Sequence, residues 1–257
     1  MTERESHQAV DENLVFGRHP AIAALQQADA QTVNKVFLQD TVQKEFAGDV
    51  LALASKHKII VSRVPKAKLD TLVAGANHQG VVVALAAFPY ASLDDIFAKA
   101  EAAGEAPFIV VLDNVEDPHN LGSIIRTADA VGVHGVVIGK HRAATLTGTV
   151  AKASAGALSR VPVARVTNLA RTIEQIKKRG VWVFGTAMDG EDFTQWNSKG
   201  PVAIVIGNEG KGISPGIAKL LDGTVTIPMA GQIQSLNASV AAAIVMYKVF
   251  LGRRGEH

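Results

Sequence analysis

Three separated segments place amide, carboxylate, guanidinium and hydroxyl side chains directly after runs of β-branched apolar residues. The first segment carries Asn120 and Arg126, the second carries Glu209, and the third carries Ser235 and Asn237. An open α/β sheet binds ligands at the carboxyl ends of its strands, and polar side chains in the following loops contact those ligands. The sequence therefore predicts one ligand site assembled from three strand ends.

The second segment is rich in glycine and resembles a phosphate-binding loop. In such a loop a lysine follows the last glycine and precedes serine or threonine. Here Lys211 precedes Gly212, and Ile213 takes the next position. No G-x-G-x-x-G pattern follows a predicted strand either, so the usual dinucleotide motif is absent as well. One interpretation is a glycine-rich turn into a helix near Ser214. A turn needs no carboxylate, however, which makes Glu209 a candidate for chemistry.

The first segment also has a purely structural interpretation. After the turn at Asp117-Pro118, Asn120 is placed to cap a helix from Leu121 to about Val131. Arg126 would then point into solvent. Its apolar neighbours favour another interpretation, in which the planar guanidinium is held against a carboxylate or a phosphate.

The third segment precedes an apolar helix that is expected to extend to about Leu251. Either Ser235 or Asn237 is suited to cap this helix. A single cap explains only one of the two, so the other is a candidate for the site.

The apolar runs between these segments predict buried strands that alternate with helices. Continuous β-branched runs are typical of parallel strands buried on both faces. They occur at 108–112, 135–138, 181–185, 202–207 and 224–227. The clearest helix is expected over Asn168–Arg179, with Asn168 as N-cap and Gly180 as C-cap. This order predicts an α/β fold whose parallel sheet is covered by helices on both faces.

The chain before residue 89 predicts a smaller α/β unit. Helices are expected at 20–27, 44–57 and 66–73, and strands at 35–38, 59–61 and 80–85. We divide the chain into a disordered tail (1–12), this small domain (13–88), a linker (89–106) and a larger domain (107–257). The linker segment could also form a solvated helix.

The composition excludes several kinds of site. The 257 residues contain no cysteine, which excludes disulfides, thiolate nucleophiles and cysteine-ligated metals. No group of His, Asp and Glu has metal-ligand spacing, so no metal is expected. No apolar run approaches the roughly 20 residues of a membrane span. The first dozen residues lack the pattern of a secretory signal, and a cytoplasmic protein is expected.

Positive charge is modest and divided between two blocks. Residues 13–88 carry eight Lys and Arg against five Asp and Glu, and residues 107–257 carry sixteen against eleven. A basic block suits a phosphate backbone, but an excess this small is also typical of an ordinary surface. The charge distribution therefore supports a nucleic-acid partner only in combination with other evidence.

The three polar segments, in this order and at this spacing, resemble the motif set of the SpoU/TrmH class of RNA ribose 2′-O-methyltransferases, in the SPOUT superfamily. The resemblance spans residues 14–252. It implies a parallel-sheet domain with a C-terminal trefoil knot, a rare exception to the absence of knots in proteins. It also implies S-adenosylmethionine (AdoMet) as cofactor. The implied catalytic residues are Asn120, Arg126, Glu209, Ser235 and Asn237, and the implied cofactor contacts are Thr186, Ala187, Ile206, Gly207, Ile227, Met229 and Leu236.

The N-terminal unit resembles the ribosomal-protein-L30e-like substrate domain of family members that act on ribosomal RNA. Within the family, the greatest similarity is to members that methylate a guanosine ribose of 23S rRNA. The resemblance therefore implies an RNA substrate and a homodimer. RNA contacts are expected from Arg18, Lys35, Arg63, Lys66, Lys68 and Arg142. The alternatives are a tRNA ribose methyltransferase and a non-catalytic RNA-binding protein.

The resemblance also implies that Arg126 acts as general base and that it can serve the active site of the opposite subunit. A guanidinium stays protonated in proteins. We therefore expect Arg126 to orient a phosphate and to stabilise negative charge on the attacking oxygen.

Overall fold

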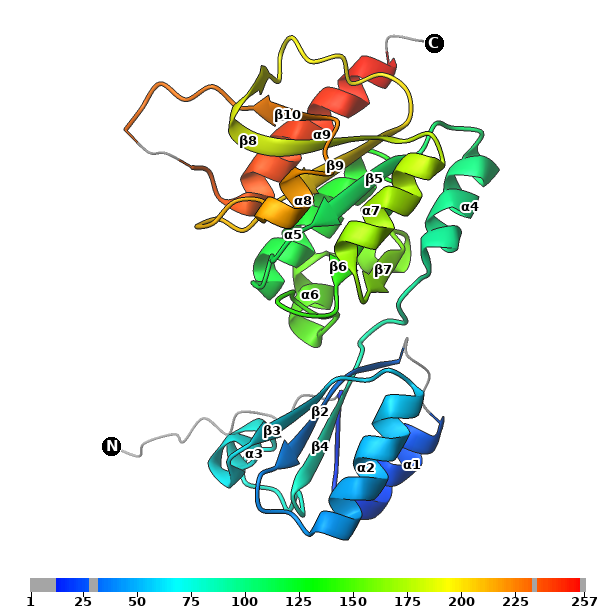
Figure 1. The fold of residues 1–257 in the computed structure, drawn as a ribbon, viewed down its shortest axis with the longest axis vertical. Helices are drawn as coiled ribbons and strands as arrows, with labels where there is room; N and C mark the ends of the chain where they lie inside the picture. Colours follow the sequence, from blue (N-terminus) through cyan, green and yellow to red (C-terminus); the bar gives the residue numbers. More distant parts are fainter. Residues whose placement is uncertain (1–12, 28–31, 233–234, 255–257) are drawn as a thin grey trace, which may run out of the picture. The chain divides into compact units, whose positions relative to one another are not determined.

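The computed structural model describes residues 13–27, 32–232 and 235–254, and the tail predicted at 1–12 lies outside them. The chain divides into two compact units, each with its own sheet and core (Figure 1). Among the described residues, the first unit comprises those up to Pro89 together with Leu146–Gly148, and the second comprises Tyr90–Thr145 and those from Thr149 onward. Both units are α/β structures, as the sequence predicts.

The first unit is a four-stranded sheet with helices on both faces. Its strands are β1 (Leu14–Phe16), β2 (Val33–Gln39), β3 (Val61–Val64) and β4 (Val81–Leu85), and its helices are α1 (Arg18–Gln27), α2 (Lys44–Lys56) and α3 (Lys66–Leu72). The strand order is β1–β4–β2–β3, in which only β2 and β3 are parallel. Helices α1 and α2 share one core with the sheet through Leu25 and Val50. Helix α3 covers the other face with Leu69, which packs near Val82.

Strand β3 begins later than its apolar residues suggest. The run at 59–61 predicts a strand there, but the ladder with β2 starts at the Val36–Val61 pair and continues to Val64. Ile59 is instead buried in the core beside α2. The apolar run therefore indicates burial at its start and strand pairing only at its end.

The second unit contains a six-stranded sheet in which all neighbouring strands are parallel. Its strands are β5 (Phe108–Leu112), β6 (Gly135–Gly139), β7 (Val163–Val166), β8 (Trp182–Asp192), β9 (Val202–Ile206) and β10 (Gly223–Thr226), in the order β10–β8–β9–β5–β6–β7. The parallel sheet agrees with the prediction. The sequence did not predict β7, and β8 continues past its expected end at Gly185.

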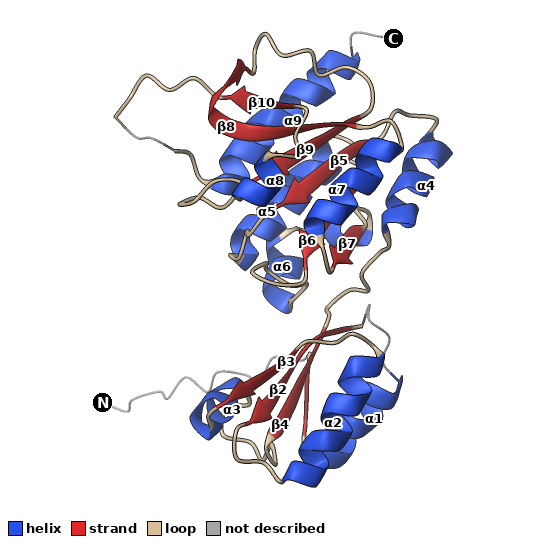
Figure 2. Cartoon of the chain, viewed as in Figure 1, coloured by secondary structure: helices blue, strands red, loops and turns tan. Residues whose placement is uncertain are grey.

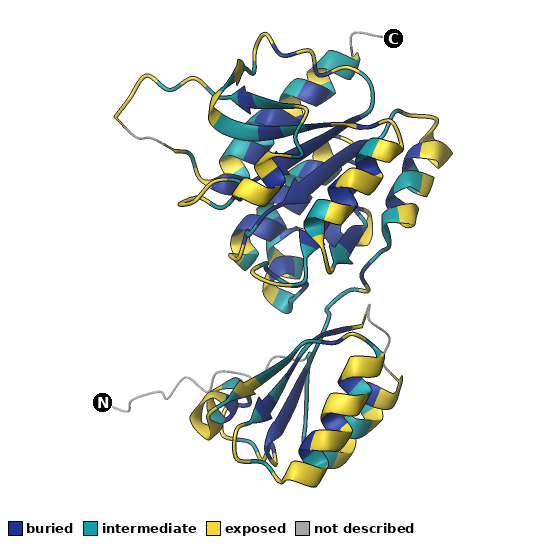
Figure 3. Ribbon diagram, viewed as in Figure 1, coloured by how far each residue is buried: buried dark blue, intermediate teal, exposed yellow. Residues whose placement is uncertain are grey.

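Helices cover both faces of this sheet (Figure 2). They are α4 (Leu93–Ala103), α5 (Pro118–Ala130), α6 (Gly148–Ala153), α7 (Leu169–Lys178), α8 (Pro215–Ala218) and α9 (Ala238–Arg254). Helices α4, α7 and α8 share a core with one face through Ile96, Ile173 and Ile217. Helices α5 and α9 pack against each other on the opposite face, and β5 and β9 are buried along their whole length (Figure 3). Within the described residues, no helix has the length and apolar character to cross a membrane.

The segment at 89–106, expected to be a linker, contains α4 and belongs to the core of the second unit. Ser92 Oγ accepts a hydrogen bond from Asp95 N at 3.1 Å, and Asp95 Oδ2 accepts one from Ser92 N at 2.7 Å. The backbone hydrogen bond from Ser92, followed by the one from its hydroxyl, lowers the pKa of the Asp95 carboxyl. Ile96 is fully buried and fills the space beside Gly135, where any Cβ would collide with it. The linker is therefore corrected to a capped helix held by core contacts.

Candidate functional site

The site begins where β5 and β9 end side by side. These strands are parallel neighbours in register from Phe108–Val202 to Leu112–Ile206. Asp113 N continues the ladder by donating to Ile206 O at 2.9 Å. Strands β6 and β7 lie on one side of this pair, and β8 and β10 lie on the other. The loops after β5 and β9 therefore meet at a switch point, the place where open α/β sheets bind ligands.

A cavity of about 580 Å³ lies at this edge, lined by strand β8, by the ends of β9 and β10 with the loops that follow them, and by the start of α9. Its volume is within the range typical of small-molecule sites. All seven residues predicted to contact the cofactor line it, namely Thr186, Ala187, Ile206, Gly207, Ile227, Met229 and Leu236. Glu209 and Ser235 line it as well. Residues that are 50 positions apart in the chain thus share one cavity.

The glycine-rich loop after β9 is folded back on itself. Asn208 N donates to Gly212 O at 3.1 Å, and Gly212 N donates to Asn208 O at 2.8 Å. A Cβ on Gly207 would collide with the backbone of Gly212 and Ile213. Gly207 is therefore required by the close approach of two backbone segments, in addition to lining the cavity.

Glu209 is held by two amide side chains from distant parts of the chain. Asn120 Nδ2 donates to Glu209 Oε1. Asn237 Nδ2 donates to Glu209 Oε1 at 3.1 Å and to Asn120 Oδ1 at 3.0 Å. Within the described residues, no group donates to Glu209 Oε2. One carboxylate oxygen is therefore fixed by neutral donors, and the other can accept a hydrogen bond from a ligand.

Asn120 does not cap α5, in contrast to the prediction. Asp117 is the N-cap, and its Oδ1 accepts a hydrogen bond from His119 N at 2.8 Å. The helix begins at Pro118, because the missing N–H of proline costs nothing at the first helical position. Asn120 then lies in the first turn, buried, with its side chain directed to Glu209.

The two candidates for the cap of α9 have different roles. Asn237 Oδ1 accepts hydrogen bonds from Ser239 N at 2.9 Å, from Val240 N at 3.4 Å and from Ser239 Oγ at 2.6 Å. Asn237 is therefore the N-cap, and its amide nitrogen serves the Glu209 cluster at the same time. Ser235 is exposed at the cavity.

Three residues that hold the loops of the site together were not predicted, namely Asp113, Asn114 and Asn208. Asp113 is buried, and its Oδ2 accepts from Ser214 N at 2.6 Å while its Oδ1 accepts from Asn114 Nδ2 at 2.8 Å. Asn208 Nδ2 donates to Asn114 O at 3.1 Å. These bonds tie the loop before α5 to the loop that carries Glu209. The sequence contained one indication of this role, which is that the carboxylate of Asp113 directly follows the apolar run at 108–112.

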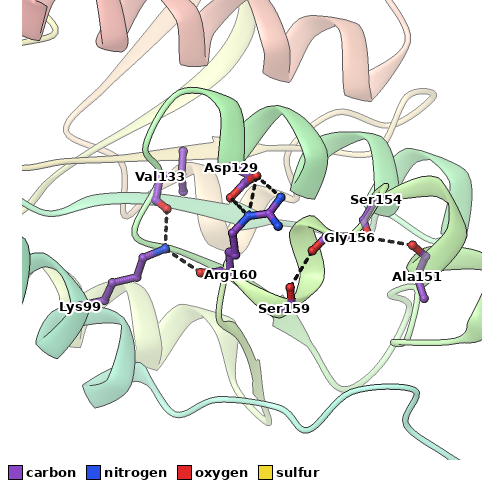
Figure 4. Close-up of polar contacts among 8 residues, drawn as sticks. All are labelled: Lys99, Asp129, Val133, Ala151, Ser154, Gly156, Ser159 and Arg160. Atoms are coloured by element: carbon purple, nitrogen blue, oxygen red, sulfur yellow. Dashed lines mark hydrogen bonds and ion pairs between the residues drawn. The ribbon is translucent and has the colours of Figure 1, made fainter.

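The far end of α5 is anchored by an ion pair (Figure 4). Arg160 Nη2 lies 2.6 Å from Asp129 Oδ2, and Arg160 Nε lies 3.0 Å from Asp129 Oδ1. The hydrogen bonds from Arg160 lower the pKa of the Asp129 carboxyl. Lys99 Nζ donates to Arg160 O at 2.8 Å, and burial lowers the pKa of this amine. Both ends of the helix that carries Asn120 are therefore fixed.

Arg126 is not part of this cluster. It lies six residues beyond Asn120 on α5, which corresponds to about 9 Å along the helix and about 120° around it. Its side chain is exposed and does not line the cavity. The structure thus brings together four of the five expected catalytic residues, with Asn120, Glu209 and Asn237 in direct contact and Ser235 beside them at the cavity.

The residues predicted to bind RNA belong to both units and differ in their surroundings. Arg18 and Lys66 line a cavity of the first unit. Lys35 Nζ lies 5.3 Å from the centre of the Phe37 ring, and Arg63 Nη1 donates to Gln39 O at 3.3 Å. Lys68 is exposed on α3, and Arg142 is exposed in the loop after β6, outside the cavity of the second unit. The described part of the chain contains no group of three His, Asp or Glu side chains that could hold a metal ion.

Comparisons with known proteins match both units. The SpoU rRNA methylase family model matches residues 107–247, and the model for RNA 2′-O ribose methyltransferase substrate binding matches residues 14–91. The Bacillus subtilis protein YacO, assigned to the TrmH family of tRNA/rRNA methyltransferases, is 50% identical over 240 residues, which are 93% of this chain and 95% of that protein.

Two solved structures share the fold over different lengths. An AdoMet-bound rRNA methyltransferase from Sinorhizobium meliloti is 26% identical with a TM-score of 0.59, covering 95% of this chain and 87% of that one. A TrmH/SpoU tRNA-modifying enzyme from A. aeolicus is 31% identical with a TM-score of 0.55, covering 59% of this chain and 78% of that one.

Proposed function

Because the chain belongs to the SpoU methylase family of RNA methyltransferases, we propose that it transfers a methyl group from AdoMet to a ribose 2′-hydroxyl of RNA. The observation that carries this proposal is the cavity at the carboxyl edge of the second sheet. It combines all seven expected cofactor residues with a carboxylate, Glu209, oriented by Asn120 and Asn237. The C-terminal knot implied by the resemblance is part of the same proposal.

The cavity has the chemical character that AdoMet requires. Apolar side chains from Ile206, Ile227 and Leu236 offer a surface for the adenine ring, and the surrounding loops offer backbone groups for hydrogen bonds. When bound, AdoMet supplies a methyl group on a positively charged sulfur, which an oxygen nucleophile can attack. The protein must therefore hold a hydroxyl in line with that methyl group and remove its proton.

We assign the hydroxyl-binding role to Glu209. Asn120 and Asn237 fix its Oε1, which leaves Oε2 as an acceptor for the 2′-hydroxyl. In this proposal the carboxylate would accept the proton while the oxygen–methyl bond forms and the sulfur–methyl bond breaks, which would leave S-adenosylhomocysteine as the second product. Fixed dipoles around a reacting group lower the barrier because they need no reorganisation during the reaction.

Arg126 is assigned to the active site of a second copy of the chain. Its side chain lies outside the cavity of its own unit. Helix α9 presents exposed apolar side chains, with 46% of Tyr247 and 61% of Leu251 accessible, beside a groove of about 510 Å³. A homodimer through this face would cover these side chains and could bring Arg126 to the partner's RNA.

Mixed dimers test this arrangement. Arg126→Ala and Asn237→Ala chains are each expected to be inactive, whereas verified heterodimers should recover activity at the one site that retains both side chains. Heterodimers without any recovery would contradict a shared site, and a monomer in solution would contradict the dimer.

We propose rRNA as the substrate, with a guanosine of the large-subunit rRNA as the methylated nucleotide. The first unit supports rRNA over tRNA. It matches the substrate-binding model, and the similar rRNA methyltransferase covers 95% of this chain whereas the tRNA-modifying enzyme covers 59%. Mapping 2′-O-methyl groups in rRNA and tRNA with and without this protein tests the assignment. A protein-dependent methyl group in tRNA alone would overturn it.

Calorimetric titration with AdoMet separates an enzyme from a non-catalytic RNA-binding protein. We expect saturable binding with one AdoMet per chain. An absence of binding, with and without RNA, would overturn the proposed activity.

A further inference from the structure

A second cavity, of about 720 Å³, opens in the first unit where β2 ends and β4 begins. Its walls come from the start of α1, the loop after β2, helix α3 and the loop before β4. The cationic and amide side chains that line it are Arg18, Lys66, Gln39, Gln43, Asn77 and Gln79. The proposed methyl transfer does not use this cavity.

The wall before β4 is held rigid by a buried histidine. Gly80 N donates to His78 Nδ1 at 2.9 Å, so the ring proton is on Nε2, which lies 3.0 Å from Asp70 Oδ1. Gln79 adopts a left-handed backbone conformation with φ of 50°, which is uncommon for a residue with a side chain. Its Oε1 accepts a hydrogen bond from Arg18 N at 2.9 Å. These contacts fix the loop against the start of α1.

Arg18 forms a flat surface at this cavity. Its guanidinium carbon lies 5.0 Å from the centre of the Phe46 ring, and its Nη1 donates to Gln43 Oε1 at 3.0 Å. The guanidinium is therefore held in place from one side by a ring and at its edge by an amide. Unstacked RNA bases stack on guanidinium planes of this kind as well as on aromatic rings.

The amides around Arg18 offer both donors and acceptors. Gln43 and Gln79 use their oxygens for Arg18, which leaves their NH₂ groups as donors. Gln39 uses its NH₂ group for Thr41 Oγ1 at 2.7 Å, which leaves its oxygen as an acceptor. Within the described residues, Asn77 makes no side-chain hydrogen bond and Lys66 makes no ion pair. A phosphate would need donors only, whereas the edge of a base presents both kinds of group.

We propose that this cavity binds one unstacked nucleotide of the RNA substrate and recognises its base through the amides, while Lys66 contacts a phosphate. The proposal rests on RNA being the substrate, as proposed above. It assigns to the first unit a preference for particular bases in single-stranded RNA, in place of general attraction to the phosphate backbone.

The test measures binding of the full-length protein to four single-stranded homopolymeric RNA nonamers by fluorescence anisotropy. We expect the best and worst nonamers to differ by about fivefold or more, since recognition of a base edge discriminates at least this strongly. Asn77→Ala should reduce that difference to less than about twofold at unchanged salt dependence. Lys66→Ala should weaken all four nonamers about equally and reduce the salt slope by about 0.7, as expected for one lost phosphate contact to a single strand.

Matched controls lie in the same unit but outside the cavity. Gln26→Ala on α1 and Lys56→Ala at the far end of α2 remove exposed side chains of the same types and should leave the base preference unchanged. Equal affinity of the unmodified protein for all four nonamers would overturn the proposal, and so would an unchanged preference in Asn77→Ala.

Photo-crosslinking gives a second readout that requires no variant. A nonamer carrying 4-thiouridine should crosslink to peptides that contain residues 39–43 or 75–80, which line the cavity. Crosslinks confined to the second unit would overturn the proposal. AdoMet titration of the same samples distinguishes this failure from failure of the proposed function, because the cofactor cavity lies in the other unit.

Discussion

The two cavities differ in how their polar side chains are used. In the second unit, Asn120, Glu209 and Asn237 bond to one another across the chain. In the first unit, the amides around Arg18 keep donors and acceptors that the protein does not use. Chemistry benefits from groups that are fixed before the substrate arrives, whereas recognition needs groups that the partner satisfies. We therefore expect substitutions to affect catalysis strongly in the second unit and selectivity more weakly in the first.

The largest effect is expected for Glu209→Gln. This change keeps an oxygen for the two amide donors but replaces the second acceptor with an NH₂ group. Loss of a proton acceptor costs about 100-fold or more in rate, and AdoMet affinity and RNA base preference should change little. Single-turnover transfer of a radiolabelled methyl group measures the effect.

Lys211→Ala is the matched control for this variant, because Lys211 lies in the same loop and lines the same cavity. It should retain most of the activity. If Glu209→Gln also retained activity within about threefold, the assignment of Glu209 as proton acceptor would be wrong.

An intermediate loss of activity is expected for Arg126→Lys. A lysine keeps the charge but loses the planar pair of donors that binds a phosphate in two places. We expect a loss of about tenfold or more in kcat/KM for RNA, without a change in AdoMet affinity. Steady-state kinetics with varied RNA measures this. Substantial activity in Arg126→Lys would contradict a role in bidentate positioning.

Gly207→Ala is expected to weaken AdoMet binding by about tenfold, because overpacking of this kind costs about 1–3 kcal/mol. The new methyl group would collide with the backbone of Gly212 and Ile213, which cannot rotate away as a side chain can. Calorimetry measures the change. Gly210→Ala is the control, since its nearest neighbour would be Asn208 Oδ1 at 3.6 Å. Equal affinity in the two variants would show that the close approach is unimportant for the cofactor site.

The smallest expected effect is a pH dependence of the free energy of unfolding of the second unit. It does not involve the proposed chemistry. His134 Nδ1 accepts from Phe108 N at 2.9 Å, and burial lowers the pKa of this imidazole below its ordinary value of 6.5, although Glu105 opposes the shift. The unfolded chain then takes up a proton that the folded chain does not. The stabilisation is complete above pH 6.5 and decreases as the pH falls below it.

The contribution of His134 to the free energy of unfolding changes by no more than about 1.4 kcal/mol per pH unit. Urea unfolding at pH 7.5 and 5.5 measures it, with His134→Asn as the comparison because Asn Oδ1 can still accept from Phe108 N. An equal pH dependence in both proteins would contradict the role of His134.

The position of the cavity in the second unit was predictable from the sequence because parallel strands end at the same edge of a sheet, whereas its proposed ligand came from the family resemblance. Ile206 and Ile227 lie at the ends of two apolar runs and Thr186 follows a third, and the sheet brings those runs together whatever the intervening helices contain. The register of β5 and β9 then places the segments with Asn120 and Glu209 side by side. Few alternatives remain once the sheet is parallel.

Other features depend on geometry that the order of residues does not reveal. Asp117 caps α5 in place of Asn120 because the helix begins at Pro118. Asp113 accepts a hydrogen bond from Ser214 N and Asn208 donates one to Asn114 O, and such contacts with the backbone of another loop leave no periodic pattern in the sequence. The basic residues were the hardest to place, since charge alone does not say which face of the sheet a long side chain occupies.

Asn237 joins the folding of α9 to the chemistry of the site through the two ends of one amide. Its oxygen holds the first turn of the helix, and its nitrogen holds Glu209 and Asn120. Aspartate would keep the oxygen but repel Glu209, and serine would cap the helix without reaching both partners. No other natural side chain of this length supplies an acceptor and a two-proton donor together. A substitution at this position would therefore disturb the first turn of α9 and the contacts of Glu209 together.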